Sequence, residues 1–266
     1  MTTGAQLVDG IWDSVDDDGV ARLRIDRPAR MNAIDAPSAA RIIDRCLTWA
    51  HDDTIRAVVL SGAGGSFCAG ADVAGMAADA AAAGGFGEDA SRAIIENGST
   101  LVSAVRALPM PVIAALDGPA VGIGASFAVA ADLLYATERT YFMLPFVTIG
   151  LMPDGAATAT FAASLGRARA NALALLGEKL WAAQALEHGL INACVEDADA
   201  LDAVVDRTVA KLVATSPTAL ATTKAAVDAH TLAGYDSAIT REIAGQTLLL
   251  QSPEFAAALA SFTSRR

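Results

Sequence analysis

The stretch DGPAVGIGASFAVAAD, residues 117–132, is the segment that decides the fold class. It follows the apolar run VIAAL at 112–116, and the two together predict a buried strand, a glycine-rich turn and then a buried helix. The short strands DLLYA and TYFMLP are expected after this helix. Such alternation of strands and helices favours an α/β core with helices on the outside.

The same alternation extends toward both ends of the chain. The expected elements are strands at 6–12 and 20–26 around the turn DDDG at 16–19, a helix at 36–50, a buried strand at 55–62, a helix at about 91–107, a helix at 155–164 and a strand near 190–196. The Ala/Gly-rich segment 74–90 has no strong period, and it predicts a mobile loop, a weak helix or a plain linker. From Leu201 onward only helical patterns are visible.

Composition narrows the class of protein. The 266 residues suit one α/β domain with an added element or two modest units, and 53% of them are hydrophobic. A net charge of -11 argues against nucleic acid as a partner, because binding phosphates needs a basic face. No apolar run reaches the ~20 residues of a membrane span, and no signal peptide is visible, so we expect a cytoplasmic protein without a membrane partner. Cys46, Cys68 and Cys194 are widely spaced and do not form a metal-ligand pattern.

Small residues recur where candidate strands end, in SFCAGADV at 66–73 and in DGPAVGIG at 117–124. They would let backbone N–H groups face a ligand at a helix start, although tight packing of strand against helix is an equally ordinary reason for them. Neither segment completes the glycine pattern of a dinucleotide site. Ser126 lies in GASFA, which lacks a glycine of the nucleophile elbow, so a serine hydrolase is disfavoured.

Taken together, three segments are far more specific than any one of them. RPARMNAI at 27–34, FCAGADV at 67–73 and DGPAVGIG at 117–124 resemble the crotonase superfamily of enoyl-CoA hydratases and isomerases. GRARA at 166–170 and AAQALEHGLI at 182–191 extend the resemblance. It implies a spiral of repeated ββα units over residues 1–200 and a C-terminal helical region, 201–266, involved in trimerisation and closure of the active site. It also implies an acyl-CoA thioester substrate, a homotrimer or dimer of trimers, and no metal or prosthetic cofactor.

The resemblance also assigns residues to the site. The backbone N–H groups of Ala71 and Ile123 are expected to form an oxyanion hole for the thioester oxygen, where fixed donors stabilise the charge of an enolate. Positions matching the coenzyme A and acyl pocket are Arg30, Met31, Ala33, Ala69, Asp72, Val73, Val121, Gly124 and Phe146. Arg30 offers a cation to a phosphate, although an ordinary surface arginine would look the same. Arg265 and Arg266 are candidates for the 3′-phosphate or simply a frayed tail.

The expected reaction depends on which carboxylates are present. Hydratases of the superfamily use two glutamates, and Ser126 and Phe146 stand at those positions here, so hydration with two carboxylates is disfavoured. In the segment GLMPDGAATA at 150–159, spacing alone predicts that Asp154 is the N-cap of the helix that follows. The segment also resembles the G-L-x-P-D/E-G motif of Δ3,Δ2-enoyl-CoA isomerases and ring-opening isomerases of phenylacetate degradation, in which that acid is the base.

We therefore expect Asp154 to move a proton between the α- and γ-carbons of a 3-enoyl-CoA. An apolar pocket formed by Phe146, Leu144 and Met152 would raise the pKa of Asp154, whereas a helix N-terminus would lower it. The alternatives are an enoyl-CoA hydratase with an unusual water arrangement, ring-opening isomerisation of a CoA epoxide, thioester hydrolysis, and a non-catalytic acyl-CoA-binding protein.

Overall fold

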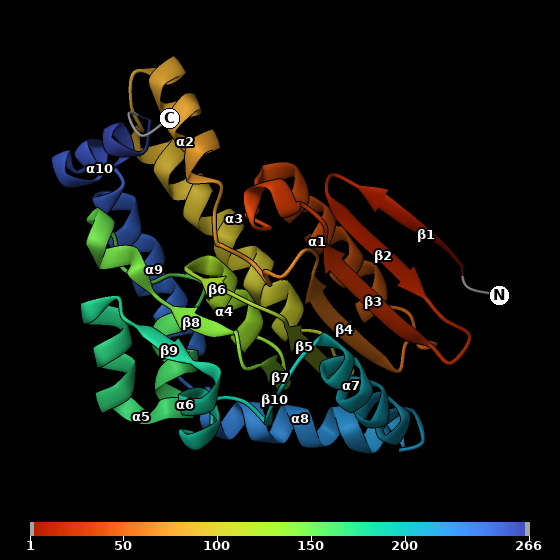
Figure 1. Cartoon of the computed structure of the whole chain (residues 1–266). Helices are drawn as coiled ribbons and strands as arrows, with labels where there is room; N and C mark the ends of the chain where they lie inside the picture. Colours follow the sequence, from red (N-terminus) through yellow and green to blue (C-terminus); the bar gives the residue numbers. More distant parts are fainter. Residues whose placement is uncertain (1–2, 264–266) are drawn as a thin grey trace.

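A seven-stranded sheet forms the centre of the computed structural model, which describes residues 3–263 (Figure 1). Its strands run in the order β1-β2-β3-β4-β5-β7-β10. Their bounds are Thr3–Val8, Ile11–Val15, Val20–Ile25, Ala57–Gly62, Val112–Leu116, Leu133–Thr137 and Ala193–Val195. The first three strands pair antiparallel, and every pairing from β3 to β10 is parallel. The predicted α/β class is confirmed.

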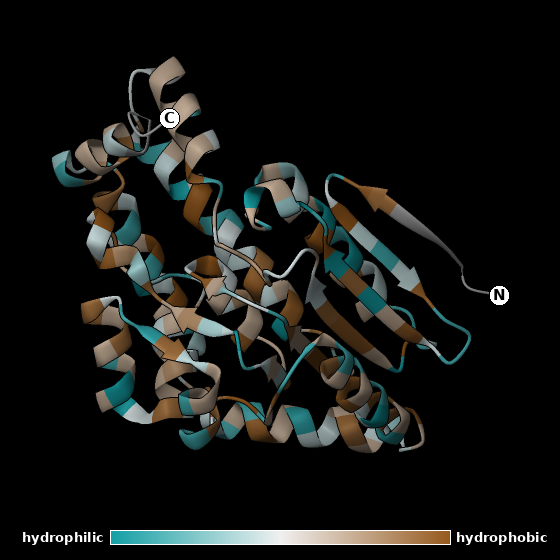
Figure 2. Ribbon diagram, in the orientation of Figure 1, coloured by the Kyte–Doolittle hydropathy of each residue, from teal (hydrophilic) through white to brown (hydrophobic). Residues whose placement is uncertain are grey.

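Strands β4 and β5, in the parallel part of the sheet, are mostly apolar (Figure 2). All five residues of β5 are buried, and so are the first four of β4. Strands covered by other elements on both faces read as continuous apolar runs, which explains why these two were visible in the sequence. A second sheet joins β6, β8 and β9, which span Ala120–Val121, Tyr141–Met143 and Lys179–Trp181.

The N-terminal hairpin differs from the expected one. A strand was expected through 6–12, but the chain turns at Asp9 and Gly10, where both residues have positive φ, 52° and 76°. Two central residues with positive φ form the turn that matches the twist of a tight hairpin, and Asp-Gly is its usual sequence. The DDDG turn at 16–19 exists as expected, but it joins β2 to β3.

Helices α1 (Ala36–Ala50) and α3 (Glu88–Arg106) lie close to their expected positions. Between them, the segment expected as a loop, weak helix or linker contains α2, Val73–Ala83. The side chain of Asp72 accepts a hydrogen bond from the N–H of Gly75 and so caps its start. Alanine has high helix propensity, and α2 also packs against a C-terminal helix, so it forms without a strong apolar period.

The remaining helices lie around both sheets and continue to the C-terminal end of the described chain (Figure 1). They are η1 Pro28–Arg30, α4 Ile123–Val129, η2 Pro145–Ile149, α5 Ala157–Leu176, α6 Ala182–Glu187, α7 Ala198–Val213, α8 Pro217–Thr231, α9 Tyr235–Leu249 and α10 Pro253–Thr263. In the C-terminal region, α9 packs against α3 and α5, and α10 packs against α2 and η2. Within residues 3–263, none of the helices combines the length and apolarity needed to cross a bilayer.

Candidate active site

Asp154 lies in the loop between η2 and α5, with 9% of its surface exposed. The Ser126 hydroxyl on α4 donates a hydrogen bond of 2.8 Å to the main-chain oxygen of Asp154. This bond fixes the loop to the buried helix that follows strands β5 and β6. Ser126 stands where a hydratase carries a glutamate, and in this chain it holds the backbone of the acidic residue.

The two oxygens of the Asp154 carboxyl group have different surroundings. Oδ2 accepts a hydrogen bond of 3.2 Å from Nε2 of Gln246 on α9. Oδ1 is buried and has no hydrogen-bond partner among the described residues. A buried polar atom without a partner costs about 1–3 kcal/mol, and a ligand that bonds to it would offset this cost. One oxygen of Asp154 is thus held, and the other is free to interact with a ligand.

The pKa of Asp154 is raised to about 7, first by burial and then by the charge of Glu242. The bond from Gln246 acts in the opposite direction, because it favours the ionised form. Of the two expected effects, an apolar pocket that raises the pKa and a helix N-terminus that lowers it, burial in the apolar pocket is the larger. A carboxylate with a pKa near neutral pH is suited to accept and return a proton.

The capping interpretation of Asp154 is wrong. Helix α5 begins after Ala156, and Glu242 of α9 takes the capping role. Its carboxylate accepts hydrogen bonds from the N–H of Ala156 at 2.6 Å, and from the N–H and hydroxyl of Thr158 at 3.0 and 2.6 Å. Because a carboxylate from another helix stabilises the start of α5, the side chain of Asp154 is free to turn away from it.

Asp154 faces a cavity of about 150 Å³ between the core and the C-terminal helices. The residues that line it are Ala69, Ala71, Val73, Met76, Ile94, Ile95, Gly98, Val121, Gly122, Ile123, Pro145, Phe146, Ile149, Leu151, Asp154, Gln246, Leu250 and Phe255. Phe146 forms part of the wall, as expected. Leu144 and Met152, also expected there, are not in this lining, and Ile149 and Leu151 take their places. Among the described lining residues, Asp154 is the only carboxylate.

Ala71 and Ile123, the expected oxyanion-hole residues, meet at this cavity. Ile34 pairs with the segment around Ala71 through two hydrogen bonds. The N–H of Ile34 donates to the carbonyl of Gly70 at 2.8 Å, and the N–H of Asp72 donates to the carbonyl of Ile34 at 2.9 Å. The bridge between Ile34 and Ala71 therefore does not use the Ala71 N–H. Ile123 is the first residue of α4, and the first N–H groups of a helix have no partner within it. Neither N–H group is used by these bonds, and both residues line the cavity.

Gly124 is required for these two segments to approach each other. A Cβ atom at this position would lie 2.5 Å from the carbonyl oxygen of Cys68 and 2.7 Å from its sulfur. Only glycine lets the start of α4 pack this closely against the chain that leads to Ala71. Gly124 thus sets the spacing of the two segments and is not itself in the lining of the cavity.

The residues expected at the coenzyme A end lie near a second, adjacent cavity of about 490 Å³. Both cavities share Ala71 and Ile123, and Asp72 lines the second. Arg30 forms an ion pair with Asp72. Met31 is exposed and Ala33 is buried. The carbonyl of Met31 accepts a hydrogen bond of 3.0 Å from the N–H of Ala69. The structure therefore joins the 30–34 and 69–73 segments, although Arg30, Met31 and Ala33 do not line either cavity. Arg265 and Arg266 lie outside the described residues.

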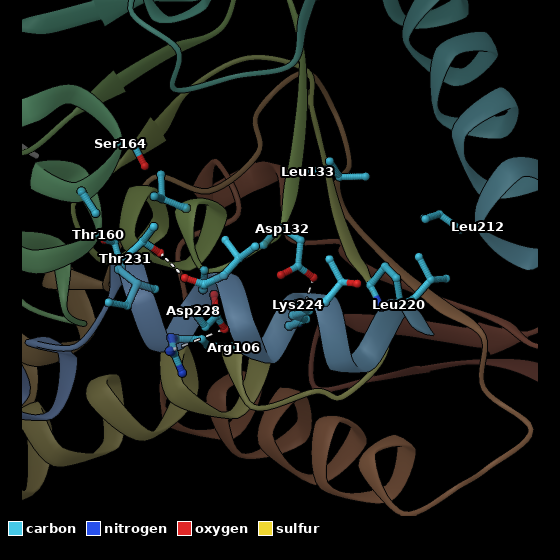
Figure 3. A pocket seen from close by; sticks show the side chains of 18 of the residues that line it. Arg106, Asp132, Leu133, Thr160, Ser164, Leu212, Leu220, Lys224, Asp228 and Thr231 are labelled. Carbon is cyan, nitrogen blue, oxygen red and sulfur yellow. Dashed lines mark hydrogen bonds and ion pairs between the residues drawn. The ribbon is translucent and has the colours of Figure 1, made fainter. Parts of the chain in front are cut away.

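A larger hollow of about 630 Å³ lies beneath α8 and has a different character (Figure 3). Its ionisable side chains form two ion pairs, Lys224 with Asp132 at 2.8 Å and Arg106 with Asp228 at 3.5 Å. Since each charge is paired within the chain, the hollow does not offer a free base. The candidate chemistry is therefore at Asp154.

Comparisons with known proteins identify the family. A family model described as enoyl-CoA hydratase/isomerase matches residues 16–266. The chain belongs to the enoyl-CoA hydratase/isomerase family. A 1,2-epoxyphenylacetyl-CoA isomerase of Escherichia coli is 33% identical over 249 residues, which cover 93% of each chain. A trans-2-decenoyl-[acyl-carrier-protein] isomerase of Streptococcus mutans is 30% identical over 254 residues, 94% of each chain.

Among solved structures, an enoyl-CoA hydratase from Mycobacterium avium subsp. paratuberculosis is 40% identical, with a TM-score of 0.86 over 97% of each chain. The crotonase fold expected from the sequence is thereby confirmed, and the protein is an enzyme of this family, which acts on acyl-CoA substrates. The relatives include both isomerases and hydratases. The family alone thus leaves the reaction open, and the residues around Asp154 have to be weighed.

Sequence reasoning expected the C-terminal region to help close the site, but it named none of the residues that do so. Glu242, Gln246, Leu250 and Phe255 surround Asp154 or line its cavity, and none was predicted. A signal was present in α9. Its buried face contains Tyr235, Ala238, Glu242 and Gln246 at helical spacing, so two polar side chains occupy positions where an apolar residue is normal.

Proposed function

We propose that the protein shifts a double bond in an enoyl-CoA from Δ3 to Δ2, with Asp154 as the single acid-base group. One observation carries the proposal: a buried carboxyl group with one unpartnered oxygen faces a cavity whose described lining contains no second carboxylate. Hydration needs a water held and activated by two such groups. Moving one proton between two carbons of the same substrate needs only one.

In the proposed reaction, Asp154 removes a proton from the α-carbon of a 3-enoyl-CoA through Oδ1. Electrons shift toward the thioester oxygen, and the N–H groups of Ala71 and Ile123 stabilise the resulting dienolate; removing one donor of this kind costs about 10²–10³ in rate in other enzymes. Asp154 then returns the proton to the γ-carbon, and the conjugated 2-enoyl-CoA forms. The proton, electrons and atoms balance within the substrate, so we propose that no metal or prosthetic group takes part.

The raised pKa of Asp154 predicts the pH dependence of this reaction. The base has to be ionised before it can take the α-proton, and its pKa is about 7. We therefore expect kcat/KM to rise with pH and to level off above neutrality. The side chains of Phe146 and Leu151 restrict water around the carboxylate, which favours return of the same proton over exchange with solvent.

A second candidate is isomerisation of an epoxide carried on coenzyme A. It is favoured by the 33% identical relative named 1,2-epoxyphenylacetyl-CoA isomerase, which matches over almost the whole chain. The same carboxyl group and N–H donors would serve it. Hydration is less well supported, because Ser126 and Phe146 replace its glutamates and Ser126 is committed to the backbone of Asp154.

The reactions are distinguished by parallel incubations with 3-enoyl-CoA, 2-enoyl-CoA and an aryl-CoA epoxide. A rise in conjugated-enoyl absorbance with the first supports the proposal. Loss of that absorbance with the second, together with an inert 3-enoyl-CoA, identifies a hydratase and contradicts it. Tight binding of every thioester with none consumed would instead indicate a non-catalytic acyl-CoA-binding protein.

We further propose that residues 201–266 close the active site and take part in assembly, as a homotrimer or a dimer of trimers in the cytoplasm. The closure is supported by Gln246, Leu250 and Phe255, which bring α9 and α10 to the cavity wall. Exposed large apolar side chains in this region, Leu248 and Val227, 71% and 54% exposed, are consistent with burial between subunits. Sedimentation velocity at several protein concentrations tests the assembly, and a monomer throughout would contradict it.

A further inference from the structure

Gln246 connects the C-terminal helices to the acidic loop through both ends of its amide. Its Oε1 accepts a hydrogen bond of 3.2 Å from the main-chain N–H of Met152, and its Nε2 donates one of 3.2 Å to Oδ2 of Asp154. Only an amide oxygen can accept from an N–H, so the bond to Met152 fixes which way the amide points. The NH2 group therefore has to face the carboxylate. Gln246 itself is fully buried on α9.

The orientation of the Asp154 carboxyl group follows from that contact. A carboxyl group turns about a single torsion, so holding Oδ2 also fixes the direction of Oδ1. Oδ1 has no partner among the described residues, and Asp154 lines the cavity. A base has to reach the α-carbon within hydrogen-bond distance, and a misplacement of about 1 Å can cost 10²-fold in rate.

Besides this neutral amide, the surroundings of the Asp154 carboxyl group include one charged side chain that shifts its pKa. Glu242, one turn before Gln246 on α9, is the charged side chain that shifts its ionisation. Glu242 is itself bonded to the start of α5, through Ala156 and Thr158. The described parts of the cavity wall that come from α2, α3, α4 and η2 are apolar. Gln246 is thus the neutral donor that favours the ionised, reactive form against burial and a nearby negative charge.

We infer that Gln246 is a positioning residue for the reaction: it holds one oxygen of Asp154 so that the other stays directed at the substrate. This inference rests on the proposed role of Asp154 as the base. It gives α9 a task beyond covering the cavity, because the orientation of the base then depends on how the C-terminal helices dock on the core.

The experiment compares Gln246→Met with the wild type on a 3-enoyl-CoA. Methionine is similar in length and unbranched, so it fills the space but can neither donate to Asp154 nor accept from Met152. We expect kcat to fall by about 10²-fold, KM to change little, and the acidic limb of the pH–rate profile to move to higher pH. Gln251→Leu is the matched control: its amide also donates a bond at the end of α9, to Thr247, and its exposed side chain leaves the pH profile unchanged.

A second readout does not depend on turnover. In ligand-free protein with ¹³C-labelled aspartate, the carboxyl signal that disappears in Asp154→Asn should titrate at a higher pH in Gln246→Met than in the wild type. A Gln246→Met variant with the kcat and pH profile of the wild type would overturn the inference. The inference would also be overturned if Tm and kcat both fell while the pH–rate profile and the carboxyl titration stayed unchanged. That result would indicate a purely structural role.

The wild type separates this result from the proposed function. If it does not convert 3-enoyl-CoA, the isomerase proposal fails and the positioning role fails with it. If it converts the substrate and Gln246→Met does so equally well, the isomerase proposal stands and only the role of Gln246 is wrong.

Discussion

The site is built from two regions that contribute different kinds of groups. In the proposed site, the strand-end loops of the core contribute the backbone N–H groups of Ala71 and Ile123, whereas helix α9 contributes the side chains of Glu242 and Gln246. Backbone donors need only a particular path of the chain, and small residues such as Gly124 set that path locally. The side chains of α9 reach Asp154 and the start of α5 across 84 to 92 residues of sequence. The oxyanion half is thus specified locally, and the surroundings of the base are specified by tertiary packing.

Asp154 lies where the two regions meet, and replacing it has the largest expected effect. Asp154→Asn keeps the size of the side chain but removes the base, so kcat should fall by at least about 10²–10⁴ while acyl-CoA binding is retained. Steady-state kinetics on a 3-enoyl-CoA measures both. Near wild-type turnover in the asparagine variant would show that Asp154 is not the base. The surroundings that α9 gives to Asp154 would then have no role in catalysis.

The stability of the same variant tests the environment of the carboxyl group. Its pKa is raised to about 7 in the folded protein, above the value of about 3.9 in an unfolded chain, so ionisation is penalised on folding. The wild type therefore loses stability as pH rises from about 4 to about 7, and Asp154→Asn does not have this loss. We expect the Tm of the variant relative to the wild type to increase between about pH 5 and about pH 8. A difference that is constant or decreases would show that the carboxyl group is not buried as described.

The next largest effect is expected in the core region, at Gly124. Gly124→Ala places a Cβ atom 2.5 Å from the carbonyl oxygen of Cys68, so α4 has to move away from the segment that contains Ala71. Misplacing one oxyanion donor should lower kcat by about 10²–10³-fold, with a smaller change in KM. Gly87→Ala is the control, because Gly87 has an ordinary φ of -77° and open space around it. Unchanged turnover in Gly124→Ala would show that the close contact does not position the donors.

The contrast between the two regions also explains what the sequence could predict. The glycine segments and the acid in GLMPDG lie on single stretches of chain, so the crotonase fold could be predicted from them. The same stretches pointed to Ala71, Ile123 and Asp154, which line one cavity. The capping role of Glu242 could not be predicted, because it is created only when α9 packs on α5. The pattern of Pro-Asp before an alanine-rich helix therefore pointed to Asp154 as the cap, although a distant carboxylate fills that place.

The contribution of α9 to the stability of the site can be tested by replacing Glu242. Glu242→Leu removes the acceptor of two N–H groups and one hydroxyl at the start of α5, so unfolding should become easier by about 1–3 kcal/mol. Chemical denaturation measures this change. Glu242→Gln keeps the shape and one acceptor oxygen and should lose less. Because the negative charge of Glu242 raises the pKa of Asp154, both variants should move the acidic limb of the pH–rate profile to lower pH. A stable Glu242→Leu protein would mean that α5 does not need this cap.

The smallest effect is expected at Arg30, on the core side and away from the reacting atoms. Its partner Asp72 also caps α2 and lies 3.9 Å from Arg27, so Arg30→Ala should leave the fold nearly as stable as before. If Arg30 also contacts a coenzyme A phosphate, its loss should raise KM by about two- to five-fold, the size of one exposed ion pair, and leave kcat unchanged, since such a contact is equally strong in the ground and transition states. Arg22, which pairs with Asp206 on α7, offers a control at a partly exposed position on the sheet. Equal KM values for Arg30→Ala, Arg22→Ala and the wild type would show that Arg30 serves only its pair with Asp72.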